Sequence, residues 1–197
     1  MIFLILGVRF NIKNKERLNQ SYPAIYLSNH SSQLDPLVAI KFAPFGACGI
    51  AKKEIASIPF FGWSYLMSGH LLIDRSNRVK AIASLKELNL AIKKMNLGVW
   101  IWPEGTRSRD GRLLTFKKGF AHIAIQTGLP IVPIVIADAH KRWPSKSMKI
   151  NSGEVHMQIL EPISTENWTQ ENLSQHIEDI RNIFIEHLPE EQRPIED

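Results

Sequence analysis

Two residues in the segment Asn29–Pro36 are suited to acid–base chemistry: His30 and, five positions later, Asp35. Within one helix, five steps of about 100° would place these side chains roughly 140° apart, so they would not meet. However, Ser31 or Ser32 is a good helix N-cap, and a proline, such as the one that ends this segment, is tolerated only in a first turn. We therefore expect a helix that begins between His30 and Asp35, with the carboxylate reaching back to an imidazole N–H.

A histidine that donates one N–H to a carboxylate has a fixed tautomer, and its other ring nitrogen is then free to accept a proton. The segment is therefore a candidate general-base site. A loop histidine next to an aspartate favoured by the dipole of the following helix would show the same residues. This motif alone does not separate the two interpretations.

A second segment, Trp102–Ser108, has the residue types of an anion site. Gly105 lets the backbone come close to a ligand, Thr106 offers a hydroxyl, and Arg107 offers a planar guanidinium that matches phosphate oxygens. A turn with one arginine is also common on solvated surfaces. The segment therefore gains weight only in combination with others.

Basic residues are concentrated in the first part of the chain. Residues 1–120 contain 18 basic and 7 acidic side chains, whereas residues 121–197 contain 6 and 12. The first part is therefore expected to face an anion, such as a phosphorylated small molecule, a membrane headgroup layer or nucleic acid. The charge pattern alone does not separate these anions.

The elements that must position these segments alternate between strands and helices. Strands are predicted near Ile2–Ile12 and at Ala24–Ser28, His70–Ile73, Gly98–Trp102 and Ile131–Ile136. Apolar residues at steps of three and four predict one helix over Arg78–Met95 and another over Leu173–Phe184, the latter after a cap at Thr169. A further helix is expected after Lys118, around His122, and a late hairpin over Met148–Leu160, turning at Asn151–Gly153.

This alternation predicts an α/β fold with a mostly parallel central sheet flanked by helices. In such folds, sites gather in the loops beyond the carboxyl ends of the strands, and both candidate segments follow a predicted strand. The length of 197 residues, a hydrophobic share of 44% and the lack of any linker or repeat predict a single domain over residues 1–197. The longest apolar opening, Met1–Val8, is far shorter than the roughly 20 residues of a transmembrane helix.

Four segments have the order and spacing of the four sequence blocks of the glycerolipid acyltransferases. They are Asn29–Pro36, Gly69–Arg75, Pro103–Ser108 and Leu129–Val135. Two stretches between the first two blocks, Lys52–Glu54 and Ile58–Gly62, also resemble that family, and the similarity covers essentially the whole chain. Within the family, the chain most resembles the bacterial 1-acylglycerol-3-phosphate acyltransferases.

The resemblance implies the transfer of a fatty acyl group from a thioester, carried by coenzyme A or acyl carrier protein, to the free sn-2 hydroxyl of lysophosphatidate, giving phosphatidate. No metal or other cofactor is implied. A hydroxyl needs a base to remove its proton during attack on a carbonyl. The roles implied for the residues are a general base (His30), its orienting carboxylate (Asp35), a phosphate-binding arginine (Arg107) in a loop shaped by Gly105 and Thr106, a carboxylate that positions this loop or bonds the glycerol part (Glu104), and further phosphate ligands (Arg75 and Lys52).

Members of this family usually carry a membrane-embedded helical segment before the first strand, whereas Met1 here starts almost on that strand. Either this segment belongs to a longer chain, or it is absent and membrane contact comes from elsewhere. We expect the chain to associate peripherally with the cytoplasmic face of the inner membrane. The candidate contact is the aromatic stretch Phe60–Trp63 with Tyr65, Leu66 and Met67, bordered by Lys52 and Lys53. A packed core helix is an equally open interpretation of this stretch.

Other chemistries have less support. The nearest approach to a serine-hydrolase elbow, Gly62–Leu66, lacks the final glycine, and Cys48 lies among small residues as core cysteines do. The histidines show no metal-ligand spacing, and nucleotide-binding glycine loops are missing. Because the cations flank the four blocks, a lipid phosphate explains them with fewer assumptions than nucleic acid. Two alternatives stay open: another acceptor, such as glycerol-3-phosphate or a different lysophospholipid, and a non-catalytic module that binds anionic lipid at a membrane surface.

Overall fold

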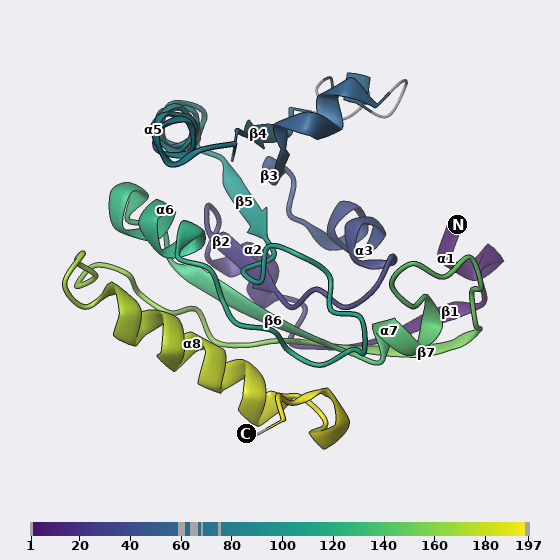
Figure 1. Ribbon diagram of the computed structural model, residues 1–197. Coiled ribbons are helices and arrows are strands. Elements are labelled where there is room, and N and C mark those ends of the chain that lie inside the picture. Colours follow the sequence, from purple (N-terminus) through teal and green to yellow (C-terminus); the bar gives the residue numbers. More distant parts are fainter. Residues whose placement is uncertain (1, 59–61, 64–66, 68, 75, 196–197) are drawn as a thin grey trace.

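The computed structural model describes residues 2–58, 62–63, 67, 69–74 and 76–195. Its centre is a seven-stranded sheet with the strand order β1-β7-β6-β2-β5-β3-β4 (Figure 1). The strands are β1 (Val8–Lys13), β2 (Ile25–Ser28), β3 (Ala47–Lys52), β4 (Leu71–Ile73), β5 (Gly98–Ile101), β6 (Ile131–Ala137) and β7 (Gly153–Ile159).

The directions of the strands decide what lies at each edge of the sheet. Five neighbouring strands, from β6 through β2, β5 and β3 to β4, run parallel. β7 runs antiparallel to β6, and β1 runs parallel to β7. The five parallel strands therefore end at one edge, and β1 and β7 begin at that same edge. The prediction of a mostly parallel sheet flanked by helices is confirmed.

Helices cover both faces of the sheet (Figure 1). One face packs against α5 (Arg78–Met95), α6 (Gly119–Thr127) and α8 (Leu173–His187). The other packs against α1 (Ile2–Ile5), α2 (Arg17–Gln20), α3 (Asp35–Phe42) and α7 (Ala139–Arg142). Two short 3-10 helices, η1 (Lys53–Ser57) and η2 (Glu190–Gln192), lie outside these layers. β2 is buried on both sides because Ile25 and Leu27 face the first layer and Tyr26 faces the second.

The predicted helices form, although one predicted cap is wrong. α5 has the predicted bounds, and the Asn77 side chain caps it by accepting a hydrogen bond from the Lys80 N–H at 2.9 Å. α8 begins at Leu173 rather than after Thr169, because Asn172 occupies the N-cap position and Thr169 only donates its N–H to the Asn172 side chain. Among the described residues, no helix combines the length and the apolar character needed to cross a bilayer.

The opening strand is shorter than predicted. Ile2–Ile5 is helical, and the strand β1 begins only at Val8. Gly7 separates the two elements with a backbone φ of +66°, a left-handed conformation that is unstrained for glycine. The apolar run is thus divided between a helical turn, from which Phe3 enters the core, and the start of the edge strand.

The predicted hairpin over Met148–Leu160 does not form. Only Gly153–Ile159 is a strand, and it pairs with β1 at the other end of the chain and with β6, the strand that precedes it in sequence. Residues 147–152 instead belong to a loop whose base is closed by a hydrogen bond from the Asn151 N–H to the Arg142 carbonyl at 2.8 Å. A local pairing partner is excluded because β7 already has a strand on each side.

Candidate active site

The two candidate segments meet at the edge where the parallel strands end. The first follows β2 and the second follows β5, and these strands are neighbours in the sheet. A backbone hydrogen bond of 2.8 Å from the Ser108 N–H to the His30 carbonyl joins the two loops directly. The prediction that each segment follows a strand is therefore confirmed, and the structure adds that the two strands are adjacent.

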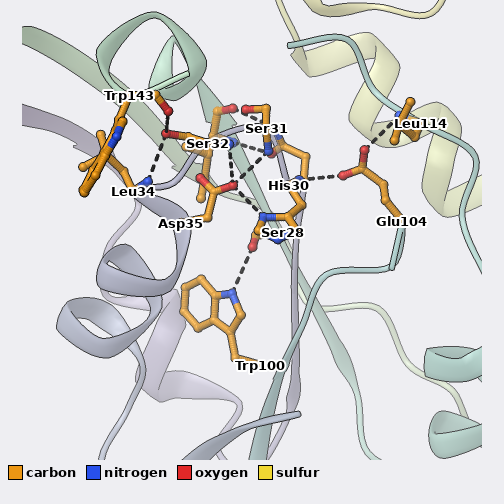
Figure 2. Close-up of polar contacts among 12 residues, drawn as sticks. Ser28, His30, Ser31, Ser32, Leu34, Asp35, Trp100, Glu104, Leu114 and Trp143 are labelled. Atoms are coloured by element: carbon orange, nitrogen blue, oxygen red, sulfur yellow. Dashed lines mark hydrogen bonds and ion pairs between the residues drawn. The ribbon is translucent and has the colours of Figure 1, made fainter. Parts of the chain in front are cut away.

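The contact between His30 and Asp35 forms as predicted (Figure 2). His30 Nδ1 lies 2.7 Å from Asp35 Oδ2, and the Asp35 side chain is 1% exposed. α3 begins at Asp35, so the histidine lies on the incoming loop and the carboxylate in the first turn. Because a carboxylate only accepts hydrogen bonds, this contact places the proton of a neutral imidazole on Nδ1 and leaves the lone pair on Nε2.

Asp35 also holds the loop that carries the histidine. The same oxygen, Oδ2, accepts hydrogen bonds of 2.8 Å from the backbone N–H groups of Ser31 and Ser32. Neither serine is the N-cap, contrary to the prediction, since that position belongs to Leu34. Instead, Ser32 Oγ accepts the Leu34 N–H at 3.0 Å. The carboxylate itself thus satisfies the amides that precede the helix.

Glu104 connects three segments from a buried position. Its Oε1 accepts the His30 N–H at 2.5 Å, and its Oε2 accepts the Leu114 N–H at 2.9 Å (Figure 2). The residue is 1% exposed. Of the two roles predicted for Glu104, these contacts favour the positioning of loops over a bond to a substrate, because both oxygens are already engaged with backbone donors.

Burial raises the pKa of Glu104 to about 8, against the lowering effect of the Leu114 and His30 N–H groups, and the nearby Asp35 carboxylate raises it further. The folded state therefore binds this proton more tightly than the unfolded state, whose pKa is 4.5. The contribution of Glu104 to the free energy of unfolding is therefore fully present below pH 4.5 and is lost as the pH rises through about 8.

Comparison of the wild type with Glu104→Gln tests this effect. From pH 5 to pH 8, the free energy of unfolding of the wild type should fall by roughly 4 kcal/mol relative to the variant, because each pKa unit corresponds to about 1.4 kcal/mol. Urea unfolding at several pH values measures the difference. Glu171→Gln is the control, since hydrogen bonding to Thr169 lowers the pKa of that exposed carboxyl and places its titration below this window. A constant difference between wild type and Glu104→Gln would contradict the prediction.

The anion-site residues line the rim of the edge. Arg107 and Thr106 are exposed, and Gly105 adopts a φ of +71° that directs the chain around the turn. Lys52 is exposed at the end of β3, where it pairs in register with Ile73, the last residue of β4. Arg75, predicted as a further phosphate ligand, lies outside the described residues.

An apolar cavity adjoins the histidine through Trp102. The indole stacks on the His30 ring, with centroids 4.6 Å apart and planes inclined by 19°. Trp102 also lines a cavity of about 270 Å³, together with Gly105 and Lys117. The other main contributors are apolar: Ile50, Ile73, Leu85, Ile101, Phe120 and Ile123. Space for an apolar group therefore lies beside the indole that stacks on the imidazole.

A third loop, which the sequence did not reveal, supports the histidine loop from behind. The Trp143 carbonyl accepts the Ser32 hydroxyl at 2.8 Å and the Gln33 N–H at 3.1 Å. The Gln33 side-chain amide donates to the Ser147 carbonyl at 2.5 Å. These contacts join residues more than 100 positions apart, so no local pattern announces them.

Cys48 is buried in the core. Burial raises the pKa of its thiol to about 11, which disfavours the thiolate that a nucleophile needs. The interpretation of Cys48 as a core residue is consistent with this position. The imidazole, its carboxylate and the exposed guanidinium therefore remain the candidate groups for the chemistry of the site.

Comparison with known proteins gives concordant matches. The family model described as Acyltransferase matches residues 9–137. A 1-acyl-sn-glycerol-3-phosphate acyltransferase of Cocos nucifera is 43% identical over 99% of this chain and 63% of its own length. One of Haemophilus influenzae is 34% identical over 96% of this chain and 80% of its own length.

A solved structure matches the fold as well. The crystal structure of the 1-acyl-sn-glycerophosphate (LPA) acyltransferase PlsC of Thermotoga maritima superimposes with a TM-score of 0.75 and 26% identity, over 92% of this chain and 74% of that chain. The relatives come from plants, fungi, animals and bacteria. The similarity therefore does not indicate a bacterial source in particular.

Proposed function

Since the chain belongs to the Acyltransferase family, we propose that it transfers a fatty acyl group from an acyl thioester to the free sn-2 hydroxyl of lysophosphatidate, forming phosphatidate. The observation that carries this proposal is the 2.7 Å contact between His30 Nδ1 and Asp35 Oδ2. Phosphate binding alone needs neither residue in that arrangement. The names of the relatives, which are 1-acyl-sn-glycerol-3-phosphate acyltransferases, support the choice of acceptor.

His30 acts as the general base in this proposal. The hydroxyl oxygen of the acceptor attacks the thioester carbonyl carbon while its proton moves to His30 Nε2. The carbon–sulfur bond then breaks, and the leaving thiolate takes the proton back from the imidazolium. Asp35 keeps the proton of the neutral ring on Nδ1 and stabilises the positive charge that forms during attack.

Arg107 binds the phosphate of the acceptor in this proposal. Its loop is tied to the His30 carbonyl through the Ser108 N–H, so a phosphate held at the rim brings the glycerol hydroxyl towards the imidazole. Binding at a distance from the reacting bond then contributes to the rate by orientation. Lys52, at the adjacent strand end, and Arg75 are additional phosphate ligands in the same proposal.

Arg107→Ala should raise the Michaelis constant for lysophosphatidate about 10–100-fold, because a charge-assisted bond to phosphate contributes roughly 1.5–3 kcal/mol. The constant for the acyl donor should change less than twofold. Steady-state kinetics with each substrate varied in turn measures both constants. Arg181→Ala, on α8, is the control and should leave both unchanged. Equal increases in the Michaelis constants for donor and acceptor in Arg107→Ala would contradict a role of Arg107 in phosphate binding.

The cavity next to Trp102 provides a place for the acyl chain of the donor. Its lining is largely aliphatic and aromatic, and its tryptophan stacks on His30, so an acyl chain there would hold its carbonyl near the base. We propose coenzyme A or acyl carrier protein as the carrier. Because the acceptor is a bilayer lipid, we also propose peripheral association with the cytoplasmic face of the membrane.

Of the predicted membrane-contact stretch, Trp63 and Met67 are exposed, whereas Phe60, Phe61, Tyr65 and Leu66 lie outside the described residues. The exposed Lys53 lies nearby in sequence, at the start of η1. Exposed apolar side chains beside a cation suit a membrane interface, and this supports the proposed association.

The test of the function is an assay for the product. Purified protein is mixed with lysophosphatidate and an acyl thioester with a radiolabelled chain, and phosphatidate is separated by chromatography. Acyl-CoA and acyl carrier protein are supplied in parallel reactions, as are glycerol-3-phosphate and other lysophospholipids. Labelled phosphatidate supports the proposal. Faster acylation of another acceptor would identify that molecule, and not lysophosphatidate, as the substrate. Lipid binding without any acylation would support a non-catalytic membrane module.

A further inference from the structure

Two segments outside the candidate site arrive at the same edge of the sheet. Because β1 and β7 begin where the parallel strands end, α1 and the loop that precedes β7 both stand at the edge that carries the His30 loop (Figure 1). A hydrogen bond of 2.9 Å from the Gly153 N–H to the Gly7 carbonyl joins them. These segments therefore adjoin each other at the edge of the sheet that also carries the candidate active site.

The loop before β7, residues 143–152, is held firmly at its base. Arg142 Nη1 donates to the Ser152 carbonyl at 2.6 Å, and the Asn151 side-chain amide donates to the Lys141 carbonyl at 2.9 Å. Near the tip, Trp143 Nε1 donates to the Ser147 carbonyl at 2.8 Å. Hydrogen bonds therefore close the base of this loop, and the tip extends from that base.

The tip combines an apolar side chain with two cations. Met148 is 92% exposed, and Lys146 and Lys149 on either side of it are also exposed. On the neighbouring α1, Ile5 is 76% exposed. A single exposed apolar side chain is ordinary on a soluble surface. Two of them, on adjoining segments at the active-site edge and next to paired lysines, have the composition of a membrane interface.

We propose that Met148, Ile5, Lys146 and Lys149 form a contact surface for a bilayer that contains anionic phospholipid. The ammonium groups would attract the negatively charged headgroups, and the two apolar side chains would enter the boundary between headgroups and acyl chains. The inference rests on the proposed function for its purpose, which is access to a lipid acceptor. Its evidence is the exposure, charge and position of these four residues.

The position of this surface relative to His30 makes it useful for catalysis. Next to Met148, the Ser147 carbonyl accepts a hydrogen bond of 2.5 Å from the Gln33 side chain, which lies within the His30 loop. In the sheet, β7 lies two strands from β2 on one side, and β3 lies two strands from it on the other. Contacts from the loop before β7 and from Trp63 and Met67, which follow β3, would therefore flank the His30 loop on both sides.

Vesicle sedimentation tests the surface directly. The full chain is mixed with vesicles of phosphatidylcholine alone or of equimolar phosphatidylcholine and phosphatidylglycerol. Met148→Asp should weaken binding to the anionic vesicles roughly tenfold or more. The double variant Lys146→Gln with Lys149→Gln should weaken it by roughly 25-fold at low salt, about fivefold per charge, and should have little effect on neutral vesicles.

Phe45→Asp is the matched control. Phe45 is fully exposed, but it directly precedes β3 and so lies at the opposite edge of the sheet. Its substitution should change vesicle binding less than twofold. Equal binding by Met148→Asp and the wild type, or an equal loss in Phe45→Asp, overturns the proposal. So does an altered molecular mass of Met148→Asp in light scattering with vesicle binding intact, since the surface would then be a protein interface.

A soluble assay keeps this inference separate from the proposed function. With short-chain lysophosphatidate below its micelle concentration and no vesicles, Met148→Asp should retain wild-type turnover, because the tip lies outside the reacting groups. Turnover lost in solution but normal binding to vesicles would refute the membrane role. A wild-type chain that makes no phosphatidate but binds anionic vesicles through Met148 would support the surface and refute the proposed function.

Discussion

Replacing His30 by alanine is expected to lower the turnover number about 10²–10⁴-fold, which is the usual contribution of a positioned general base. Among the described residues, His30 is the one base in contact with the Asp35 carboxylate, and its Nδ1 lies 2.7 Å from Asp35 Oδ2. The Michaelis constants should change far less than turnover, because the sites proposed for the phosphate and the acyl chain do not include His30. Steady-state rates of phosphatidate formation measure the loss.

The His30 variant should remain folded. The ring is partly buried against Trp102, but the bonds that hold the loop come from backbone groups, including the His30 N–H to Glu104. Circular dichroism and urea unfolding check this. His187→Ala, at the exposed end of α8, is the control and should keep wild-type turnover. Turnover of folded His30→Ala within a few-fold of wild type would falsify the assignment of the base.

Elements with a clear periodic pattern could be predicted from the sequence. Arg78–Met95 repeats its apolar positions at helical steps and is preceded by a capping asparagine, so both its type and its bounds were predictable. The buried strands β2, β5 and β6 are short apolar runs between turn residues. Such local signals suffice because they depend on one segment only.

Elements defined by distant partners could not be predicted in the same way. β3, Ala47–Lys52, contains small residues and no alternating pattern, and it forms a strand because β5 and β4 flank it. The failed hairpin shows the same limit, since β7 pairs with β1 at the far end of the chain. For both β3 and β7, pairing with strands elsewhere in the chain determines the structure more than the local sequence pattern does.

The contacts of the candidate site also divide into local ones, which the sequence could predict, and long-range ones, which it could not. The His30–Asp35 contact spans five residues and follows from the start of a helix between them, so it was predictable. The bonds from Glu104 to the His30 and Leu114 backbones span 74 and 10 residues. The support from Trp143 spans 111 residues. The sequence therefore revealed the contact between His30 and Asp35, and the structure was needed to reveal what holds it.

Asp35→Asn is expected to lower turnover by about 10²–10⁴-fold with little loss of stability. An asparagine oxygen in place of Asp35 Oδ2 can still accept the backbone N–H groups of Ser31 and Ser32, which lie at 2.8 Å. It can also accept the Nδ1–H of His30. What it lacks is the negative charge that stabilises the imidazolium formed during attack. Steady-state kinetics should therefore show the loss in turnover, with the acceptor Michaelis constant nearly unchanged.

Asp35→Ala separates the charge from the hydrogen bonds. Without the carboxylate, two buried backbone N–H groups lose their acceptor, at about 1–3 kcal/mol each, and the loop that carries His30 is no longer held. This variant should lose stability in urea unfolding as well as turnover, whereas Asp35→Asn should lose turnover alone. If Asp35→Asn keeps near wild-type turnover, the negative charge has no role in the reaction. Asp35 would then serve only to shape the loop, and stabilisation of the imidazolium would have to come from another group.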